Sequence, residues 1–503
     1  IDGLADFLAS GVDDRTHLAY SCLTDAYKVS ELDSEKHLLV HRMVASLVDE
    51  AIPLECLKAT TLWSYGWESA SILIEQDAVE SFLKNPDYAD CTYTRGKRGC
   101  FYKAGKLKLA GNASENWAIV ADINKNQSAV AELSLALSDK VALWKAVQSD
   151  ILKGRNALEA LIQASDGLQV CSEEIVSTYH RANILFNIMR GGVFADNYTI
   201  SKSLLKQHLS QHNKRLSADS LELIDGLDDT FTYNELCTLC ESQSEDFDFK
   251  RICNEYLPLV FSRRHGDPSR PWNRFKIQTE DSQGNPIVGF QGNWRDIFQN
   301  WEALAWSFPH YNEAFIYKFL NASTADGYNP YRITDKGIEW EEPDPNDPWA
   351  SIGYWGDHQI IYLLKLLEFT ESLKSHSLNQ LLNEDRFVFA EVPYEIKDFD
   401  FLEVDPNHSI HFNEARNAAI SERTQAIGAD GKLVHDDQSQ IVRANLFEKL
   451  LIPFVVKLSN YVPNGGIWMN TQRPEWNDAN NALAGFGLSM VTTYYMHRYL
   501  EFF

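Results

Sequence analysis

The polar stretch TQRPEWNDANN, near the end of the sequence, combines the residue types that cleavage of a glycosidic bond needs. Glu475 and Asp478 are three positions apart, Trp476 and Asn477 lie between them, and Arg473 comes just before. Such cleavage requires a carboxyl group of raised pKa to protonate the leaving oxygen, together with a base-activated water or an attacking anion. Both acids are therefore catalytic candidates. Helix capping is the alternative, because an apolar run follows them.

Two further motifs place acids at the start of apolar helical runs. In GNWRDIFQN, Arg295, Asp296 and Gln299 stand together, and in GYWGDHQIIYLL, Asp357 and His358 begin the run. Capping explains either Asp alone, since the helix dipole favours an acid at an N-terminus, but it does not explain Arg295 and Gln299 beside Asp296. We predict that Asp357 is a third catalytic candidate and that the other four residues bind substrate.

Tryptophan residues surround these motifs. The chain has 13 of them, and sugars bind to flat aromatic faces and to carboxylate, amide and Arg side chains. We predict that Trp294, Trp355 and Trp476 belong to the site, together with Asn477 and Arg473. Trp301 and Trp306, which lie inside a helical run, are expected in the core instead.

The stretch RRHGDPSRPWNRF forms a basic loop interrupted by proline. Its density of Arg suggests recognition of anions or hydroxyl groups, and the alternative is a solvated basic surface. The candidate anion-binding residues are Arg263, Arg264, His265 and Arg270.

Composition limits the partners and the compartment. The formal net charge of -25 argues against nucleic acid and anionic membranes and suits a neutral substrate. No uninterrupted apolar stretch of the sequence approaches the roughly 18 residues that a membrane-spanning helix needs. Cys237 and Cys240 form a CxxC without a second ligand pair, so we predict no metal and no cofactor. The cysteines are expected as buried thiols of a cytoplasmic protein.

The hydrophobic patterns predict an α+β multidomain chain. Alternating strands bounded by Gly turns fill residues 59–137, and helical periodicity follows. We predict a β-sandwich portion at 1–137, a helical linker at 138–170 and a helical catalytic domain at 171–503, with an insertion near 196–275. Helices are expected at 294–306, 357–373, 444–462 and 480–503, with almost no strand after residue 290.

These motifs resemble those of the cellobiose and chitobiose phosphorylase family, glycoside hydrolase family 94. GNWRDIFQN resembles its G-x-R-D-x-x-Q-D motif, GYWGDHQIIYLL its S-D-D-H-x-W-L helix start, and EWNDANN its D-W-N-D-G loop, in the same order. The chain departs from the family at Asn300 and Glu475, where the family has Asp.

The resemblance implies a β-sandwich joined to an (α/α)6 barrel and a phosphorolysis that inverts the anomeric centre. By the same resemblance Asp478 is the general acid, Arg295 and Asp296 bind the sugar on the non-reducing side of the cleaved bond, and Trp476 and Asn477 shape the loop of the acid. Few residues follow Asp478, so we expect a second copy of the chain, another chain or a further segment to complete the barrel.

Three functions remain open on the sequence. The first is a glycoside phosphorylase acting on an oligosaccharide, with inorganic phosphate as co-substrate. The second is an inverting glycoside hydrolase in which Asp357 or Glu475 activates water. The third is a carbohydrate-binding or scaffold protein without catalysis.

The first prediction concerns the general acid. Replacing Asp478 with Asn removes the proton for the leaving oxygen and lowers kcat by about 10²- to 10⁴-fold, the usual contribution of general acid catalysis. Release of reducing sugar or sugar phosphate from a panel of oligosaccharides measures the loss. Glu174→Gln, outside every motif, is the control, and equal turnover of wild type and Asp478→Asn contradicts the assignment.

Overall fold

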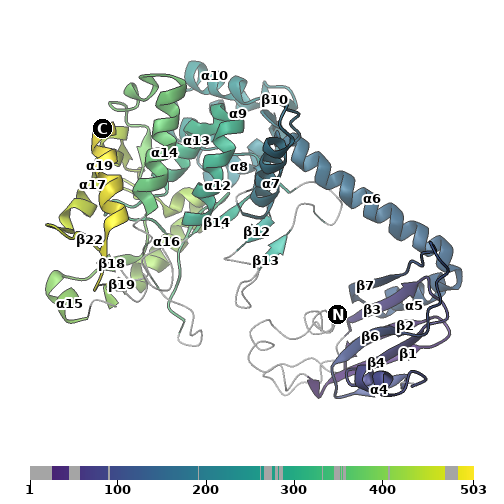
Figure 1. Ribbon diagram of the computed structural model, residues 1–503. Coiled ribbons are helices and arrows are strands. Elements are labelled where there is room, and N and C mark those ends of the chain that lie inside the picture. The colour runs from purple at the N-terminus through teal and green to yellow at the C-terminus, as the bar shows by residue number, and fades with distance from the viewer. Residues whose placement is uncertain are drawn as a thin grey trace. The chain divides into compact units, whose positions relative to one another are not determined.

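The computed structural model describes most of the chain in two compact units, Ile1–Asn156 and Ala157–Phe503. The fold is α+β and multidomain, and its sheets are small and antiparallel (Figure 1). The described residues are 25–44, 57–88, 91–190, 192–260, 262–264, 275–277, 281, 287–330, 332–344, 352, 354, 358–405, 408–470 and 485–503.

The first unit is built on a five-stranded antiparallel sheet in the order β5-β1-β2-β3-β7. Leu39 and Leu62 are register partners on β2 and β3 and pack against Ile72, Ile74 and Phe101 of a second, two-stranded sheet. The strands are β1 (Lys28–Asp33), β2 (Leu38–Met43), β3 (Ala59–Tyr65), β5 (Tyr93–Arg95) and β7 (Ala118–Lys125), and the second sheet pairs β4 (Ser71–Glu75) with β6 (Gly99–Ala104).

Helices contribute to the core on the other side of the five-stranded sheet. Because successive side chains of a strand point to opposite faces, Leu38 and Trp63 face away from Leu39 and Leu62, and they pack against Leu137. The helices of this region are α4 (Ala78–Lys84), α5 (Gln127–Ala136), the 3-10 turn η1 (Leu137–Asp139) and α6 (Lys140–Ala164). The boundary between the two units falls within α6.

The second unit is mainly helical. Its core lies among α12, α13 and α14, where Trp301 stacks on Phe315 with ring centroids 5.1 Å apart and Phe298 packs edge-on against Trp301. Trp301 is in the core as expected, but the expectation was wrong for Trp306, which is 71% exposed on the same helix. The helices are α7 (Glu174–Arg190), α8 (Lys202–His212), α9 (Ala218–Asp225), α10 (Tyr233–Gln243), α11 (Phe247–Asn254), α12 (Trp294–Ser307), α13 (Asn312–Asn321), α14 (His358–Leu373), α15 (Phe399–Val404), α16 (Glu414–Ile427), α17 (Leu446–Ser459) and α19 (Met490–Phe502).

Short strand pairs connect these helices, and those that follow residue 290 correct our expectation of almost no strand there. Each strand has only two or three residues, which is too short for an alternating pattern to be visible in the sequence. The pairs are β8 (Val193–Phe194) with β11 (Leu259–Val260), β9 (Thr199–Ser201) with β10 (Thr230–Thr232), β12 (Ser262–Arg264) with β13 (Phe275–Ile277), β17 (Phe387–Val388) with β20 (Arg443–Ala444), and β18 (Tyr394–Ile396) with β19 (Ile410–Phe412).

Two three-stranded sheets complete the second unit, β14 (Gln291–Asn293) with β15 (Arg332–Thr334) and β16 (Gly337–Glu339), and β21 (Tyr461–Val462) with β22 (Gly466–Trp468) and β23 (Leu488–Ser489). Of the helix expected over 480–503, residues 480–484 lie outside the described chain. The helix α19 begins at Met490, because Leu488 and Ser489 pair with β22 and the Ser489 hydroxyl accepts a hydrogen bond from the Thr492 N–H as a cap. No helix of the described chain is long and apolar enough to cross a membrane.

The second prediction concerns the core of this unit. Phe315 is fully buried against Trp301, so Phe315→Ala leaves a cavity and lowers the free energy of unfolding by about 3–5 kcal/mol. Urea unfolding followed by tryptophan fluorescence measures the change. Phe186→Ala, on the exposed face of α7, is the matched control and is expected to change stability far less.

Candidate functional site

The predicted site residues divide into those within and those outside the described chain. Arg295 and Asp296 lie in the first turn of α12, His358 is the first residue of α14, and Arg263 and Arg264 belong to β12. The residues outside the described chain are Arg473, Glu475, Trp476, Asn477, Asp478, Trp355, Asp357, His265 and Arg270.

Two predicted substrate-binding side chains on α12 can be placed. Gln299 is exposed. Trp294 is fully buried between Phe298 and Phe319, so its indole offers no exposed face for stacking on a sugar. Its indole N–H has no hydrogen-bond partner in the part of the chain that the structure describes. The proximity of Trp294 to acidic residues in the sequence could not distinguish this core position from a site position.

The loop that follows α13 contacts residues beside two of the predicted motifs. The ring of Tyr328 stacks on Tyr354, the residue before Trp355, with centroids 4.9 Å apart. The Tyr328 hydroxyl lies 3.4 Å from the side-chain nitrogen of Asn470, a residue that shortly precedes Arg473. The two motifs are distant in sequence, and Tyr328 therefore brings their described neighbours together.

The same loop leads directly into the strand that pairs with the third motif. Arg332, at the start of β15, is the register partner of Asn293, which immediately precedes Trp294. Arg332 also forms an ion pair of 2.9 Å with Glu339 on β16. We define residues 322–332 as the central loop, because its residues meet the flanks of all three motifs.

Local hydrogen bonds and a close helix contact hold the central loop. The Thr324 hydroxyl donates to the Tyr328 carbonyl, and the Tyr328 N–H donates to the Thr324 hydroxyl at 3.1 Å. Gly327 has a φ of +83°, and a Cβ there would lie 2.8 Å from the Val456 side chain of α17. Glycine therefore allows both the left-handed turn and the contact with α17.

Aromatic rings and polar groups enclose the central loop. The Tyr354 hydroxyl lies 3.2 Å from Asp326 Oδ2 and 3.4 Å from the Tyr394 carbonyl oxygen. Lys457, buried on α17, places its Nζ 5.3 Å from the centre of the Tyr328 ring, within the range of a cation–π interaction. This cluster of Tyr, Asp, Asn and Lys side chains is the candidate site.

The described residues before and after the segment 471–484, which contains Asp478, contact each other. The Trp468 indole N–H donates to the Gly485 carbonyl at 2.9 Å, and the Gly485 N–H donates to the Met469 carbonyl at 2.6 Å. The Met469 N–H donates in turn to the Gly487 carbonyl. The described residues that flank 471–484 are thus held together beside β22.

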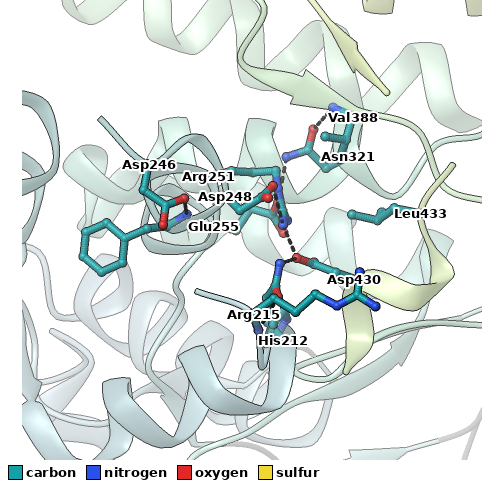
Figure 2. A network of polar contacts seen from close by, with 12 residues as sticks. His212, Arg215, Asp246, Asp248, Arg251, Glu255, Asn321, Val388, Asp430 and Leu433 are labelled. Carbon is teal, nitrogen blue, oxygen red and sulfur yellow. Dashed lines mark hydrogen bonds and ion pairs between the residues drawn. The ribbon is translucent and has the colours of Figure 1, made fainter. Parts of the chain in front are cut away.

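A second polar cluster lies around Arg251 of α11, fully buried in the second unit (Figure 2). Its guanidinium forms ion pairs of 2.6 Å with Asp430 and 3.2 Å with Glu255. The Asn213 amide donates to Asp430, and the Asn321 amide donates to Glu255 at 2.7 Å. Figure 2 shows Arg251, Glu255, Asn321 and Asp430 close together. Arg251 lies on α11, Asn321 is the last residue of α13, and Asp430 lies in the 3-10 turn η5 (Ala429–Lys432).

Beside this ionic cluster is a cavity of about 40 Å³, large enough for water. His212 and Lys318 line it with Arg251, Glu255 and Asp430. The imidazole of His212 has one nitrogen without a hydrogen-bond partner in the described chain, and burial lowers its pKa well below the usual value. None of these residues was predicted as a site residue, and we interpret the cluster as a structural junction.

Within the described residues no group of three or more His, Cys, Asp and Glu could hold a metal ion. Cys171 is exposed, so the expectation of buried thiols was wrong for that residue. Cys240 and Cys253 are buried free thiols, and burial raises the pKa of Cys253 well above its usual value. Protonated thiols of this kind are poor metal ligands and poor nucleophiles.

A segment of the sequence that includes Arg251 is similar to a known family of domains. Residues 194–258 match the family model of glycoside hydrolase family 149 insertion domain 1. No curated protein matches the chain. The match supports a carbohydrate-active protein of the glycoside hydrolase and phosphorylase type, and it does not single out the cellobiose and chitobiose phosphorylase family. The matched segment overlaps the insertion that we predicted near 196–275, whose boundaries stay predictions.

Sequence reasoning missed the central loop. The stretch DGYNPYR has the same mixture of aromatic, acidic, amide and Arg residues as the predicted motifs, with Gly and Asn-Pro as turn signals. That composition could have identified it. The ionic cluster around Arg251 carried no comparable signal, because its members are scattered from Asn213 to Asp430.

The third prediction concerns the pH dependence of stability. Burial raises the pKa of Asp430 to about 6 from 3.8, and Arg251 offsets only part of the rise. The folded state therefore holds this proton more tightly than the unfolded state. The stabilisation from Asp430 is complete below pH 3.8 and is lost as the pH rises through about 6.

The test compares wild type with Asp430→Asn, which cannot titrate. The free energy of unfolding of wild type, relative to the variant, is expected to fall by roughly 2–3 kcal/mol between about pH 4 and about pH 7. Urea unfolding at a series of pH values measures the difference. The exposed Asp437→Asn is the control. A difference that stays constant or grows with pH contradicts the prediction.

Proposed function

We propose that this protein is an enzyme that cleaves glycosidic bonds of an oligosaccharide with inversion of the anomeric centre, and that inorganic phosphate is the attacking group. The observation that carries the proposal is the central loop. Its Tyr328 and Arg332 contact the described flanks of three motifs that each contain an acid. Carboxylates, amides and aromatic rings gathered in this way suit the hydroxyl groups and C–H faces of sugars.

The comparison with known proteins supports the same class of substrate. A glycoside hydrolase insertion domain matches residues 194–258, and this segment is joined to α13 through the contact between Glu255 and Asn321. Asn321 is the last residue of α13 and directly precedes the central loop. We propose the fold of the cellobiose and chitobiose phosphorylases for the whole chain, a β-sandwich followed by an (α/α)6 barrel that a second copy, another chain or a further segment completes.

In this mechanism Asp478 donates a proton to the leaving oxygen, and Arg295 and Asp296 bind the sugar on the non-reducing side of the cleaved bond. Phosphate attacks the anomeric carbon from the opposite face, the bond to the leaving oxygen breaks, and a sugar 1-phosphate forms. In the hydrolytic alternative Asp357 or Glu475 accepts a proton from water, which attacks instead. Inverting enzymes of that type separate the two carboxyl groups by about 6.5–9.5 Å to admit the water.

The fourth prediction separates these outcomes. Wild-type protein incubated with a panel of oligosaccharides is expected to release a sugar 1-phosphate only when phosphate is present, and NMR identifies the anomer at the moment of formation. Reducing sugar released equally well without phosphate would instead establish hydrolysis. Oligosaccharide affinity without turnover in either buffer, for both wild type and Asp478→Asn, overturns the proposal in favour of a binding protein.

A further inference from the structure

The central loop carries an exposed acid, Asp326, to which the proposed function assigns no role. Its Oδ2 lies 3.2 Å from the hydroxyl of Tyr354, whose ring stacks on Tyr328. The carboxyl group of Asp326 is thus accessible. It is hydrogen-bonded to Tyr354, which stacks on Tyr328, and these two rings bring the flanks of two motifs together.

The Tyr354 hydroxyl links Asp326 to the neighbouring backbone. It lies within reach of two acceptors, Asp326 Oδ2 at 3.2 Å and the Tyr394 carbonyl oxygen at 3.4 Å. The Tyr354 O–H donates to the Asp326 carboxylate and so holds that side chain in place on the central loop.

The protein atoms around the carboxyl group also affect its ionisation. Although the side chain reaches the surface, neighbouring protein atoms reduce its hydration and raise the pKa of Asp326, and hydrogen bonds from Thr324 and Tyr354 offset only part of the rise. Its carboxyl oxygens can accept hydrogen bonds from the hydroxyl groups of a sugar.

Asn329, in the same loop, shows a second unusual feature. It is fully buried, and neither its amide nitrogen nor its amide oxygen has a hydrogen-bond partner in the described part of the chain. A buried polar group without a partner destabilises the fold. Natural proteins retain such groups mainly at functional sites, and Asn329 therefore favours a functional reason for the sequence of this loop.

We propose that Asp326 is a substrate-contacting, specificity-determining carboxyl group that hydrogen bonds to a sugar hydroxyl, and that Tyr354 positions it. This inference rests on the proposed function, since it names a residue of the same site. It predicts that the enzyme discriminates among oligosaccharides at the one hydroxyl group that Asp326 contacts.

The fifth prediction is tested with wild type, Asp326→Ala, Asp326→Asn and Tyr354→Phe, acting on an oligosaccharide that wild type cleaves and on its singly deoxygenated analogues. Asp326→Ala is expected to lower kcat/KM about 10- to 100-fold, mainly through KM, because a hydrogen bond to a charged or polar group is lost. Asp326→Asn restores part of the activity, and Tyr354→Phe causes a smaller loss.

The decisive measurement is the energetic coupling between the Asp326 side chain and the sugar hydroxyl group that it contacts. For wild type, one deoxy analogue reacts about 10- to 100-fold more slowly than the parent sugar, whereas for Asp326→Ala the two react equally. Asp335→Ala is the matched control, because Asp335 is another acid whose pKa burial raises. It lies between β15 and β16, and its carboxyl group packs beside Gly289. This control is expected to keep the discrimination of wild type.

The outcomes separate the two proposals. If wild type turns over no oligosaccharide, the proposed function fails. If wild type is active and Asp326→Ala keeps both its kcat/KM and its discrimination against every deoxy analogue, only the role of Asp326 fails. Differential scanning fluorimetry confirms that each variant is folded, and Asp326→Asn carries the test if Asp326→Ala does not fold.

Discussion

The buried charge of Arg251 is the constraint on which much of the second unit depends. An ion taken out of water must be matched nearby, and here Asp430 and Glu255 match it. Glu255 is held in turn by Asn321, whose side-chain oxygen accepts the Val388 N–H at 2.9 Å. The ionic cluster therefore fixes the end of α13, and with it the point from which the central loop starts.

A second buried cation secures the beginning of the central loop. Lys449 of α17 donates to the carbonyl oxygens of Ser323 and Val388, and its Nζ lies 3.9 Å from the centre of the Phe389 ring. Burial lowers the pKa of Lys449 well below its usual value. Tyr328 follows Ser323 by five residues. Thus the segment matched to a glycoside hydrolase insertion domain and the candidate site are connected through a short, well-packed stretch.

The sequence predicted the longer elements and missed those made by distant residues. The periodicity of apolar residues located α12, α14 and α17, because each buries one face over several turns. The strands from β14 to β23 were missed, since pairs of two or three residues depend on partners far away in the chain. Trp294 shows the same limit within the site. Its neighbours suggested a sugar contact, but packing against Phe319 decides its position. The roles of Asp478, Glu475 and Asp357 stay predictions.

The hydrogen bonds that join Trp468 and Met469 to Gly485 have an entropic consequence. Bringing two distant points of a chain together costs loop-closure entropy. The clamp at β22 holds these two points together in the folded protein, so this entropy is lost when the protein folds and not when it binds a ligand.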